Sequence, residues 1–418
     1  MTHVSTTDPV DQIDTEQQSS TALMVLEGGY YFTIFYTVLG GAFGLTIGNI
    51  GSGFLMLPLF GLCLFATGPY LMTVLYPISL ALCCGVSYLL IELFIHNESL
   101  SALYVRDFGP WLLSLVIVQS LALRPRFLHR FAVFSFLIGL AILPFLNVRQ
   151  GSTYARFGLE AAVGYSNPNA MAGWFGFCAV YFTIRGYVDK RTIMRIGSWL
   201  AGIGCLYVVT LTVSRGTLLA VAVAVLLASR HLLRGGFLPL FLLGGLGWIV
   251  IQLGVFDEAT HSYTMRGIEE TGRLLVWPLL IERMLESPLV GVGASHTGEV
   301  VVQTGEFITP HNGFLLIGVA SGIAPLMLFI AHWVRAAKHA WLANAGAWPD
   351  AAFHGPLLAY TLLIVCAGNL DFMTPWAIVS LAIPLAARVN WTTTLLSMAH
   401  RDSLMSDPFD PKRPAVRA

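Results

Sequence analysis

Long apolar runs separated by mostly short polar loops dominate the chain. A helix needs roughly 20 apolar residues to cross the hydrocarbon core of a bilayer, and about twelve stretches have this character. They begin near residues 30, 52, 72, 109, 128, 168, 197, 216, 237, 312, 354 and 375. The pattern predicts an all-α, polytopic membrane protein.

The two ends of the chain are polar. Residues 1–29 contain five acidic residues but no Lys or Arg, unlike a secretory signal with its basic start. We expect a disordered cytoplasmic tail over 1–29, a transmembrane helical domain over 30–398 and a cytoplasmic C-terminal tail over 399–418.

One connection is much longer than the others. Residues 254–311 lie between the ninth and tenth predicted spans, and a loop of this length in a compact bundle is usually functional or disordered. Within it, residues 273–285 have apolar positions at helical spacing and predict an amphipathic helix at the membrane interface. The segment 288–293, which contains Pro288, Gly291 and Gly293, then ends that helix.

Composition supports the membrane interpretation. The 418 residues are 56% hydrophobic and 11% charged, with a mean hydropathy of +0.72, which excludes an ordinary soluble domain. The formal net charge of +0 argues against a nucleic-acid partner. All six cysteines fall in apolar segments, so we expect them to pack as small hydrophobic residues rather than to form disulfides or bind metal.

Basic residues indicate the orientation, because Lys and Arg accumulate in cytoplasmic loops. One set of alternate loops holds Arg124, Arg126, Arg130, Arg185, Lys190, Arg191, Arg195, Arg230, Arg234, Arg335 and Lys338. The other set holds arginine and no lysine: Arg106, Arg149, Arg156, Arg215, Arg266, Arg273 and Arg283. Both termini are therefore predicted to be cytoplasmic, and the long loop lies on the outer side. A guanidinium group can donate two parallel hydrogen bonds to one phosphate. We therefore expect this outer face to bind a diphosphate ligand.

Five motifs in this order resemble the O-antigen ligase family, which includes related polysaccharide polymerases. They are Asn167-Pro168-Asn169-Ala170, Ser214-Arg215-Gly216, Arg273 with Trp277, the segment Ser287–Gly293, and His311-Asn312-Gly313. The resemblance implies a membrane glycosyltransferase C fold, a glycan donor linked to lipid diphosphate, no metal and functional roles for Arg215, Arg273 and His311.

The arginines suit the chemistry that this resemblance implies. When a glycan leaves polyprenyl diphosphate, negative charge develops on the departing oxygen, and fixed cations stabilise it. Arg215 opens a predicted helix whose first amides could also bind an anion. Arg273 lies four residues before Trp277, on the same helical face, and the indole could stack on the guanidinium or on a sugar. Alternatively, Arg215 extends to the headgroups, and Arg273 and Trp277 anchor a helix at the interface.

His311 is the predicted catalytic base. A neutral imidazole can take the proton of an acceptor hydroxyl, and the start of a helix disfavours the charged imidazolium. Asn312 is a good helix cap, and Gly313 allows a substrate to approach closely. His296 on the same loop is the rival base, and a capping or packing role for His311 is the alternative.

Other residues on the outer side are supporting candidates. Asp371 and Glu92 could orient the base or an arginine, and Arg149 and Arg156 could bind the glycan or the second phosphate. Asn167 and Asn169 could instead cap the following helix. We expect no metal and no cofactor, because the outer side has no Asp-x-Asp pair and arginine supplies the positive charge.

These residues and the resemblance predict a metal-independent, inverting glycosyltransferase of the bacterial cytoplasmic (inner) membrane, active on the outer, periplasmic side. It would transfer a glycan from undecaprenyl diphosphate to lipid A-core during lipopolysaccharide assembly, as an O-antigen ligase. A polymerase that extends repeat units, a transporter of the lipid-linked glycan and a structural assembly partner are the alternatives. Transport generally places polar groups near the membrane midplane, whereas these candidates gather at one face.

Overall fold

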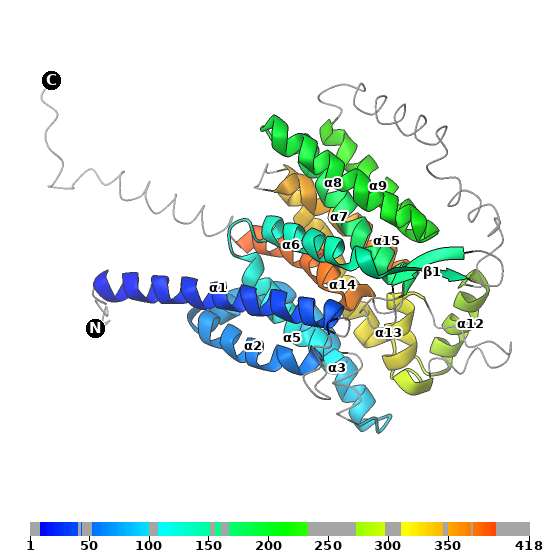
Figure 1. Ribbon diagram of the computed structural model, residues 1–418. Coiled ribbons are helices and arrows are strands. Elements are labelled where there is room, and N and C mark those ends of the chain that lie inside the picture. Colours follow the sequence, from blue (N-terminus) through cyan, green and yellow to red (C-terminus); the bar gives the residue numbers. More distant parts are fainter. Residues whose placement is uncertain are drawn as a thin grey trace, which may run out of the picture.

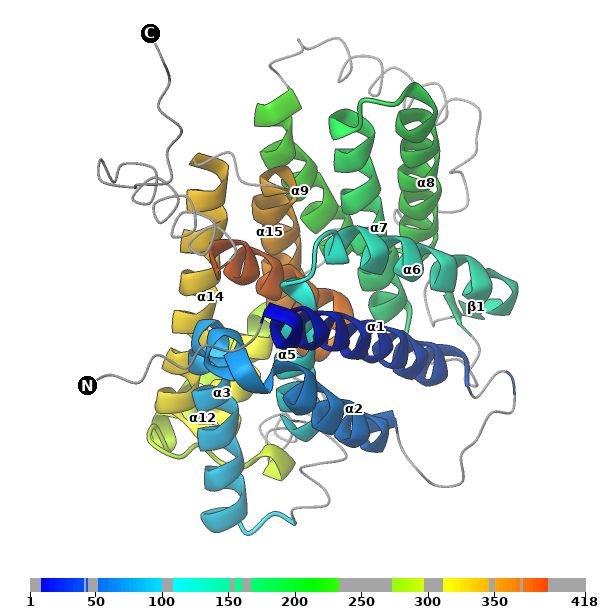
Figure 2. The same cartoon turned by 90° about the vertical axis from the view of Figure 1, so that its left-hand side faces the viewer.

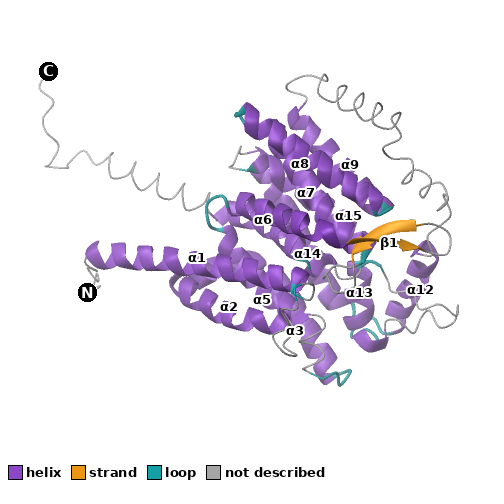
Figure 3. Cartoon of the chain, viewed as in Figure 1, coloured by secondary structure: helices purple, strands orange, loops and turns teal. Residues whose placement is uncertain are grey.

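The computed structural model describes residues 9–40, 43, 52–99, 108–150, 155–159, 167–232, 273–296, 311–345, 350–368 and 371–389. Helices make up most of these residues (Figures 1 and 3). They are α1 (Pro9–Leu39), α2 (Ser52–Thr67), α3 (Leu71–Phe94), α5 (Phe108–Ala122), α6 (Phe127–Ile142), α7 (Pro168–Val188), α8 (Thr192–Leu211), α9 (Arg215–Leu232), α12 (Arg273–Glu286), α13 (Gly313–Ser321), α14 (Ile323–Ala345), α15 (Ala351–Ala367) and a last helix over Pro375–Val389.

Most predicted helix starts are confirmed. Helices α2, α3, α5, α6, α7 and α9 begin at or next to the predicted positions, and α8 and α15 begin a few residues earlier. The amphipathic helix predicted over 273–285 is α12. The span predicted near residue 237, the tail over 399–418 and two parts of the long loop, 254–272 and 297–310, lie outside the described residues.

The apolar character expected of a membrane protein is also confirmed. Among the described residues, four helices are long and apolar enough to cross a membrane: Thr21–Leu39, Leu71–Phe94, Phe127–Phe145 and Thr192–Leu211. Shorter apolar helices include those over Gly53–Thr67, Phe108–Ala122 and Ala351–Ala367. The total of about twelve spans stays a prediction.

The first helix begins earlier than the sequence predicts. Helix α1 is 31 residues long, so the boundary expected at residue 29 lies inside it. Glu27, assigned to the tail, is only 5% exposed and accepts hydrogen bonds from Arg130 Nε at 2.7 Å and Nη2 at 2.9 Å. It also pairs with Arg124. A buried carboxylate is tolerable when it is paired and hydrogen-bonded, and these bonds explain how the helix includes an acidic residue.

The all-α fold class is confirmed in the described residues, and a short two-stranded hairpin accompanies the helices. Strands β1 (Leu146–Gln150) and β2 (Ala155–Leu159) are antiparallel, and Arg149 and Arg156 occupy directly opposed register positions. The orange arrows in Figure 3 show the hairpin beside the helices. Its sequence alternates apolar and polar residues at Leu146-Asn147-Val148-Arg149, which is the period of a strand rather than a helix.

The tenth predicted span, expected from residue 312, is broken at Gly322. This glycine has a φ of +84°, and it separates the nine-residue α13 from the 23-residue α14. The Phe314 ring, near the start of α13, lies 5.1 Å from Phe329 and 5.8 Å from Trp333, both well inside α14. Helix α13 therefore folds back along α14 instead of continuing it.

Several helices have one end in common, which we call the site end. Helices α3 and α14 are antiparallel. Arg335 in the middle of α14 bonds Tyr76 O near the start of α3 at 3.0 Å, and His96 just after α3 contacts Val290 O, in the segment that bonds the start of α14. Helix α15 begins where α14 ends, since Gly355 lies against Asn344. Gly216 of α9 in turn lies against Ala367 at the end of α15. The end of α3, the end of α15 and the starts of α9 and α14 therefore share the site end, and Figure 2 shows α9, α14 and α15 side by side.

Aromatic packing links the elements near the site end. The Phe372 ring, which follows α15, lies 5.2 Å from Phe329 of α14 and 5.6 Å from Trp111 of α5. Phe329 also contacts Phe314 of α13. Such pairs contribute about 0.5–1.5 kcal/mol each beyond the burial of their area, so α5, α13, α14 and the turn after α15 form one rigid unit.

We predict that Gly322→Ala destabilises the protein. An added Cβ would lie 2.4 Å from Leu289 O, and the backbone region that Gly322 occupies costs other residues about 1–3 kcal/mol. Gly61→Ala in α2 is the matched control, because a Cβ there meets nothing within 4 Å. Thermal unfolding in detergent should show a lower midpoint for Gly322→Ala only; equal midpoints for both variants would contradict the strained turn.

Candidate functional site

Arg215 is the first residue of α9 and lies at the site end. The turn from α8 is tight: Val213 has a φ of +54°, and its amide donates to Thr210 O at 3.1 Å. The buried Ser214 and Thr217 hydroxyls are 3.0 Å apart and fix the first turn of α9. The half-buried Arg215 is thus placed beside the end of α15 through its neighbour Gly216.

Asp371 occupies the turn that follows α15. A Cβ added to Gly368 would overlap Asp371 Oδ2, so the carboxylate folds back over the backbone of Gly368. Thr374 Oγ1 donates to Asp371 O at 2.6 Å and holds the turn. Asp371 and Arg215 therefore lie at the same end of α15, as the sequence predicts for two residues on one side of the membrane.

His311 and Asn312 precede α13. Asn312 Oδ1 accepts hydrogen bonds from Phe314 N at 3.0 Å and Leu315 N at 3.2 Å, so the predicted helix cap is confirmed. His311 is half-buried and has a φ of +48°. A positive φ is uncommon outside glycine, and it turns the chain sharply just before the helix whose positive dipole end faces this histidine.

Helix α12 packs parallel to α13. Val276 and Leu280 of α12 form a small core with Val319 of α13, and Trp277 and Leu315 pack against that core. Met284 near the end of α12 lies against Gly318 near the end of α13, and Pro288 just after α12 bonds Ile323 just after α13, so the two helices end together. Because the two helices run in the same direction, Arg273 and Trp277 lie near the end of α13 that His311 precedes. Figure 1 shows α12 beside α13.

The segment Ser287–Gly293 fixes this parallel packing. The amides of Val292 and Gly293 donate to Val319 O at 2.8 Å and Ala320 O at 2.9 Å, and Ile323 N donates to Pro288 O at 2.8 Å. Gly291 has a φ of +68°, and a Cβ there would lie 2.3 Å from Ala320 O. The glycines of this segment thus allow one backbone to lie directly on another. We call residues 287–293 the glycine loop.

The end of α3 contacts the glycine loop from the other side. Glu92, which is 0% exposed, accepts a hydrogen bond from Ala294 N at 3.0 Å. His96 Nε2 lies 2.9 Å from Val290 O, and a carbonyl can only accept, so this nitrogen carries a proton. Glu92 is among the residues predicted from the sequence, and His96 is not. Their spacing of four residues, at the end of an apolar helix, was the signal that could have identified both.

The remaining candidates are described mainly by their backbone. His296 ends the turn Ala294–His296, directly after the glycine loop. Arg149 and Arg156 are register partners in the hairpin, which lies against the core through the buried Leu159. The helix-cap alternative holds for Asn167, whose Oδ1 accepts from Asn169 N at 2.9 Å.

Acidic, cysteine and histidine side chains form no metal cluster in the described part of the chain. No three of them lie close enough together there to hold an ion. Independence from metal stays a prediction.

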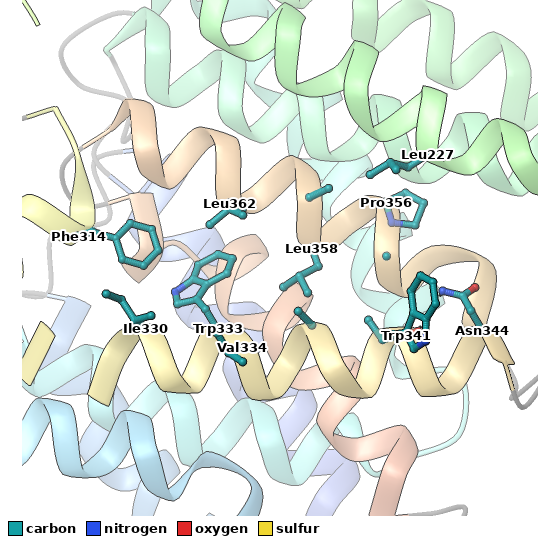
Figure 4. A pocket seen from close by; sticks show the side chains of 14 residues that line it. Leu227, Phe314, Ile330, Trp333, Val334, Trp341, Asn344, Pro356, Leu358 and Leu362 are labelled. Atoms are coloured by element: carbon teal, nitrogen blue, oxygen red, sulfur yellow. Dashed lines mark hydrogen bonds between the residues drawn. The ribbon is translucent and has the colours of Figure 1, made fainter. Parts of the chain in front are cut away.

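A groove of about 460 Å³ runs between α14 and α15 and begins at Phe314. Figure 4 shows Phe314, Trp333 and Leu362 toward one end of it, and Trp341 and Asn344 toward the other. Leu227 of α9 also lines it. Trp341 is 67% and Leu362 39% exposed, so the groove opens on the outside of the bundle. It is an apolar channel along two helices, with one end three residues from His311.

A comparison with known protein families gives a match over the part of the chain that contains these candidate residues. The family model described as O-antigen ligase matches residues 200–330, a range that contains Arg215, Arg273 and His311. None of the curated proteins matches this chain. The resemblance to the O-antigen ligase family, which the sequence motifs predict, is thereby confirmed over residues 200–330.

Proposed function

We propose that this membrane protein is an inverting glycosyltransferase that moves a glycan from a polyprenyl diphosphate to an acceptor hydroxyl. The family match supports an enzyme of polysaccharide assembly. The observation that carries the proposal is that the start of α9 lies beside the end of α15, while α12 and α13 pack together and run in the same direction. Arg215 begins α9, Arg273 begins α12, and His311 with Asn312 precedes α13.

Two of these helix starts suit the leaving group. In the reaction, the bond between the anomeric carbon and the diphosphate oxygen breaks, and the oxygen keeps the electron pair. The guanidinium groups of Arg215 and Arg273 are fixed cations for that charge, and first-turn amides of α9 add hydrogen-bond donors. Positive charge from arginine makes a divalent metal unnecessary in this mechanism.

The third helix start suits the acceptor. His311 takes the proton of the acceptor hydroxyl while the hydroxyl oxygen bonds to the anomeric carbon on the face opposite the diphosphate. A helix start disfavours positive charge on an imidazole, and a base must be neutral to take the proton. Direct displacement of this kind inverts the anomeric carbon. Trp277, Asn312, Asp371, Arg149, Arg156 and His296 are supporting residues in the proposal.

The groove between α14 and α15 supports a donor with a lipid chain. A polyprenyl chain is pure hydrocarbon, and burying it in an apolar channel is favourable by roughly 25 cal/mol per Å² of apolar surface. The groove begins at Phe314, next to the proposed base, and opens on the outside of the bundle where membrane lipid would lie. A lipid chain in this groove would carry its diphosphate toward the starts of α9, α12 and α13.

We further propose the inner membrane of a bacterium as the location, with both termini in the cytoplasm and the site end on the periplasmic side. Undecaprenyl diphosphate is the proposed carrier, and lipid A-core the proposed acceptor, which makes the protein an O-antigen ligase. A polymerase would use the same residues with a growing chain as acceptor. Mass spectrometry of carrier-linked glycans in a deletion strain separates the two, because finished chains accumulate without a ligase and single repeats without a polymerase.

We predict that His311→Ala abolishes transfer while donor binding survives. Loss of a general base typically costs about 10²–10⁴ in rate, whereas the arginines that hold the diphosphate remain. The measurement is product formation by the purified protein with donor and acceptor, together with donor binding to the same sample. His339→Ala in α14 is the control and should turn over normally.

Normal turnover of His311→Ala would contradict its role as base. If the wild-type protein itself forms no product in detergent but moves the donor across a vesicle membrane, the transporter alternative holds instead.

We predict that Arg273→Lys weakens donor binding by about tenfold, since a lysine keeps the charge but loses the bidentate fork and its charge-assisted hydrogen bonds. Arg283→Lys is the matched control on the same helix. Arg283 pairs with Glu286 near the opposite end of α12, so its replacement should leave the affinity unchanged. Titration with the donor measures both; equal affinities would remove Arg273 from the diphosphate site.

A further inference from the structure

The end of α3 carries a fully buried carboxylate, and apolar packing alone does not explain why it is there. Glu92 is 0% exposed in a helix that is otherwise strongly apolar. Placing an ionisable group in such surroundings costs several kcal/mol unless hydrogen bonds or partners compensate. Ionisable residues within apolar membrane segments are accordingly rare and commonly functional.

Glu92 reaches a segment that is distant in sequence. Its Oε2 accepts the hydrogen bond of Ala294 N at 3.0 Å, immediately after the glycine loop. One turn further, His96 Nε2 donates to Val290 O inside the loop at 2.9 Å. The His96 ring also covers Gly293, where an added Cβ would lie 3.1 Å from its Cγ. The side chains of Glu92 in α3 and of His96 just after α3 thus hold the two ends of residues 290–294.

The glycine loop transmits this contact to the proposed catalytic elements. Its opposite side is bonded to α13 through Val292 N and Gly293 N, and to the start of α14 through Pro288 O. The loop is also the direct continuation of α12. Its position therefore determines how α12, with Arg273, packs along α13, whose start follows His311.

We propose that Glu92 and His96 are positioning residues for the donor site. They hold the glycine loop against α13, so that Arg273 at the start of α12 is aligned for the diphosphate while His311 stays at the start of α13. This inference rests on the proposed function, because it assigns Arg273 to the donor. Glu92 and His96 act through the loop.

The test is a pair of variants in the purified full-length protein, Glu92→Ala and Glu92→Gln, assayed with a polyprenyl-diphosphate-linked glycan. Glu92→Ala removes the acceptor of the Ala294 bond, and we expect the KM for the donor to rise about tenfold, the effect of one charge-assisted hydrogen bond. The kcat per folded molecule and the KM for the acceptor should change far less. In Glu92→Gln the amide oxygen still accepts from Ala294 N, so the donor KM should return close to the wild-type value.

Glu27→Ala is the matched control, because Glu27 is also a buried carboxylate, in α1, and bonds Arg124 and Arg130 rather than the loop. Its loss should lower the amount of folded protein and leave the donor KM unchanged. His96→Ala is the second test variant: it removes the bond to Val290 O, involves no buried charge, and should also raise the donor KM.

Hydrogen–deuterium exchange supplies a readout that needs no activity. In Glu92→Ala and His96→Ala the amides of residues 287–294 and 313–321 should exchange faster than in the wild type, and in Glu27→Ala they should not. A wild-type donor KM in both Glu92→Ala and His96→Ala, or unchanged exchange of the loop, would overturn the inference even if His311→Ala is inactive. Full activity of His311→Ala would instead refute the proposed function. The exchange result would then still test whether Glu92 and His96 hold the loop.

Discussion

The backbone contact between the glycine loop and the α13–α14 turn is the constraint on which the site depends. Hydrogen bonds from Val292, Gly293 and Ile323 join two chain segments that would otherwise be separate, and positive φ values at Gly291, Gly293 and Gly322 allow the close approach. No larger residue could occupy these positions without strain. Because this contact sets α12 parallel to α13, it brings the start of one helix to the start of the other.

Charge is arranged differently at the two ends of the molecule. Away from the site end, acidic groups join helices to one another: the buried Glu27 binds Arg124 and Arg130, and the half-buried Asp350 accepts from His129 at 3.0 Å. Burial alone would raise the pKa of Asp350, but the hydrogen bond and charge of His129 hold that pKa below its ordinary value. By contrast, Arg215 begins α9 beside the end of α15, and Arg273 begins α12. At such helix starts an anionic ligand would meet both a cation and helix amides.

Sequence reasoning predicted the helices well because apolar runs and helix caps are local signals. The starts of α2, α7 and α9 and the cap at Asn312 depend on residues only a few positions away. The same signals could not predict features that depend on contacts between residues distant in sequence. Glu27 belongs to a helix because Arg124 and Arg130 neutralise it, and the expected tenth span is broken because Gly322 meets Leu289. His96 was missed for the same reason, since its partner Val290 is remote in sequence.

At the site, too, the sequence predicted local features but not contacts between distant segments. The sequence predicted Arg215, Arg273, His311 and Asp371 on one side of the membrane, and the structure brings Arg215 and Asp371 to the same end of α15. It could not show that α13 folds back along α14, or that α12 runs parallel to α13. A cryo-electron microscopy structure of the protein with a polyprenyl diphosphate would show where the donor binds. We expect the diphosphate among the starts of α9, α12 and α13, with the lipid chain in the groove beside α14; a diphosphate bound at the opposite end of the helices would contradict the proposed site.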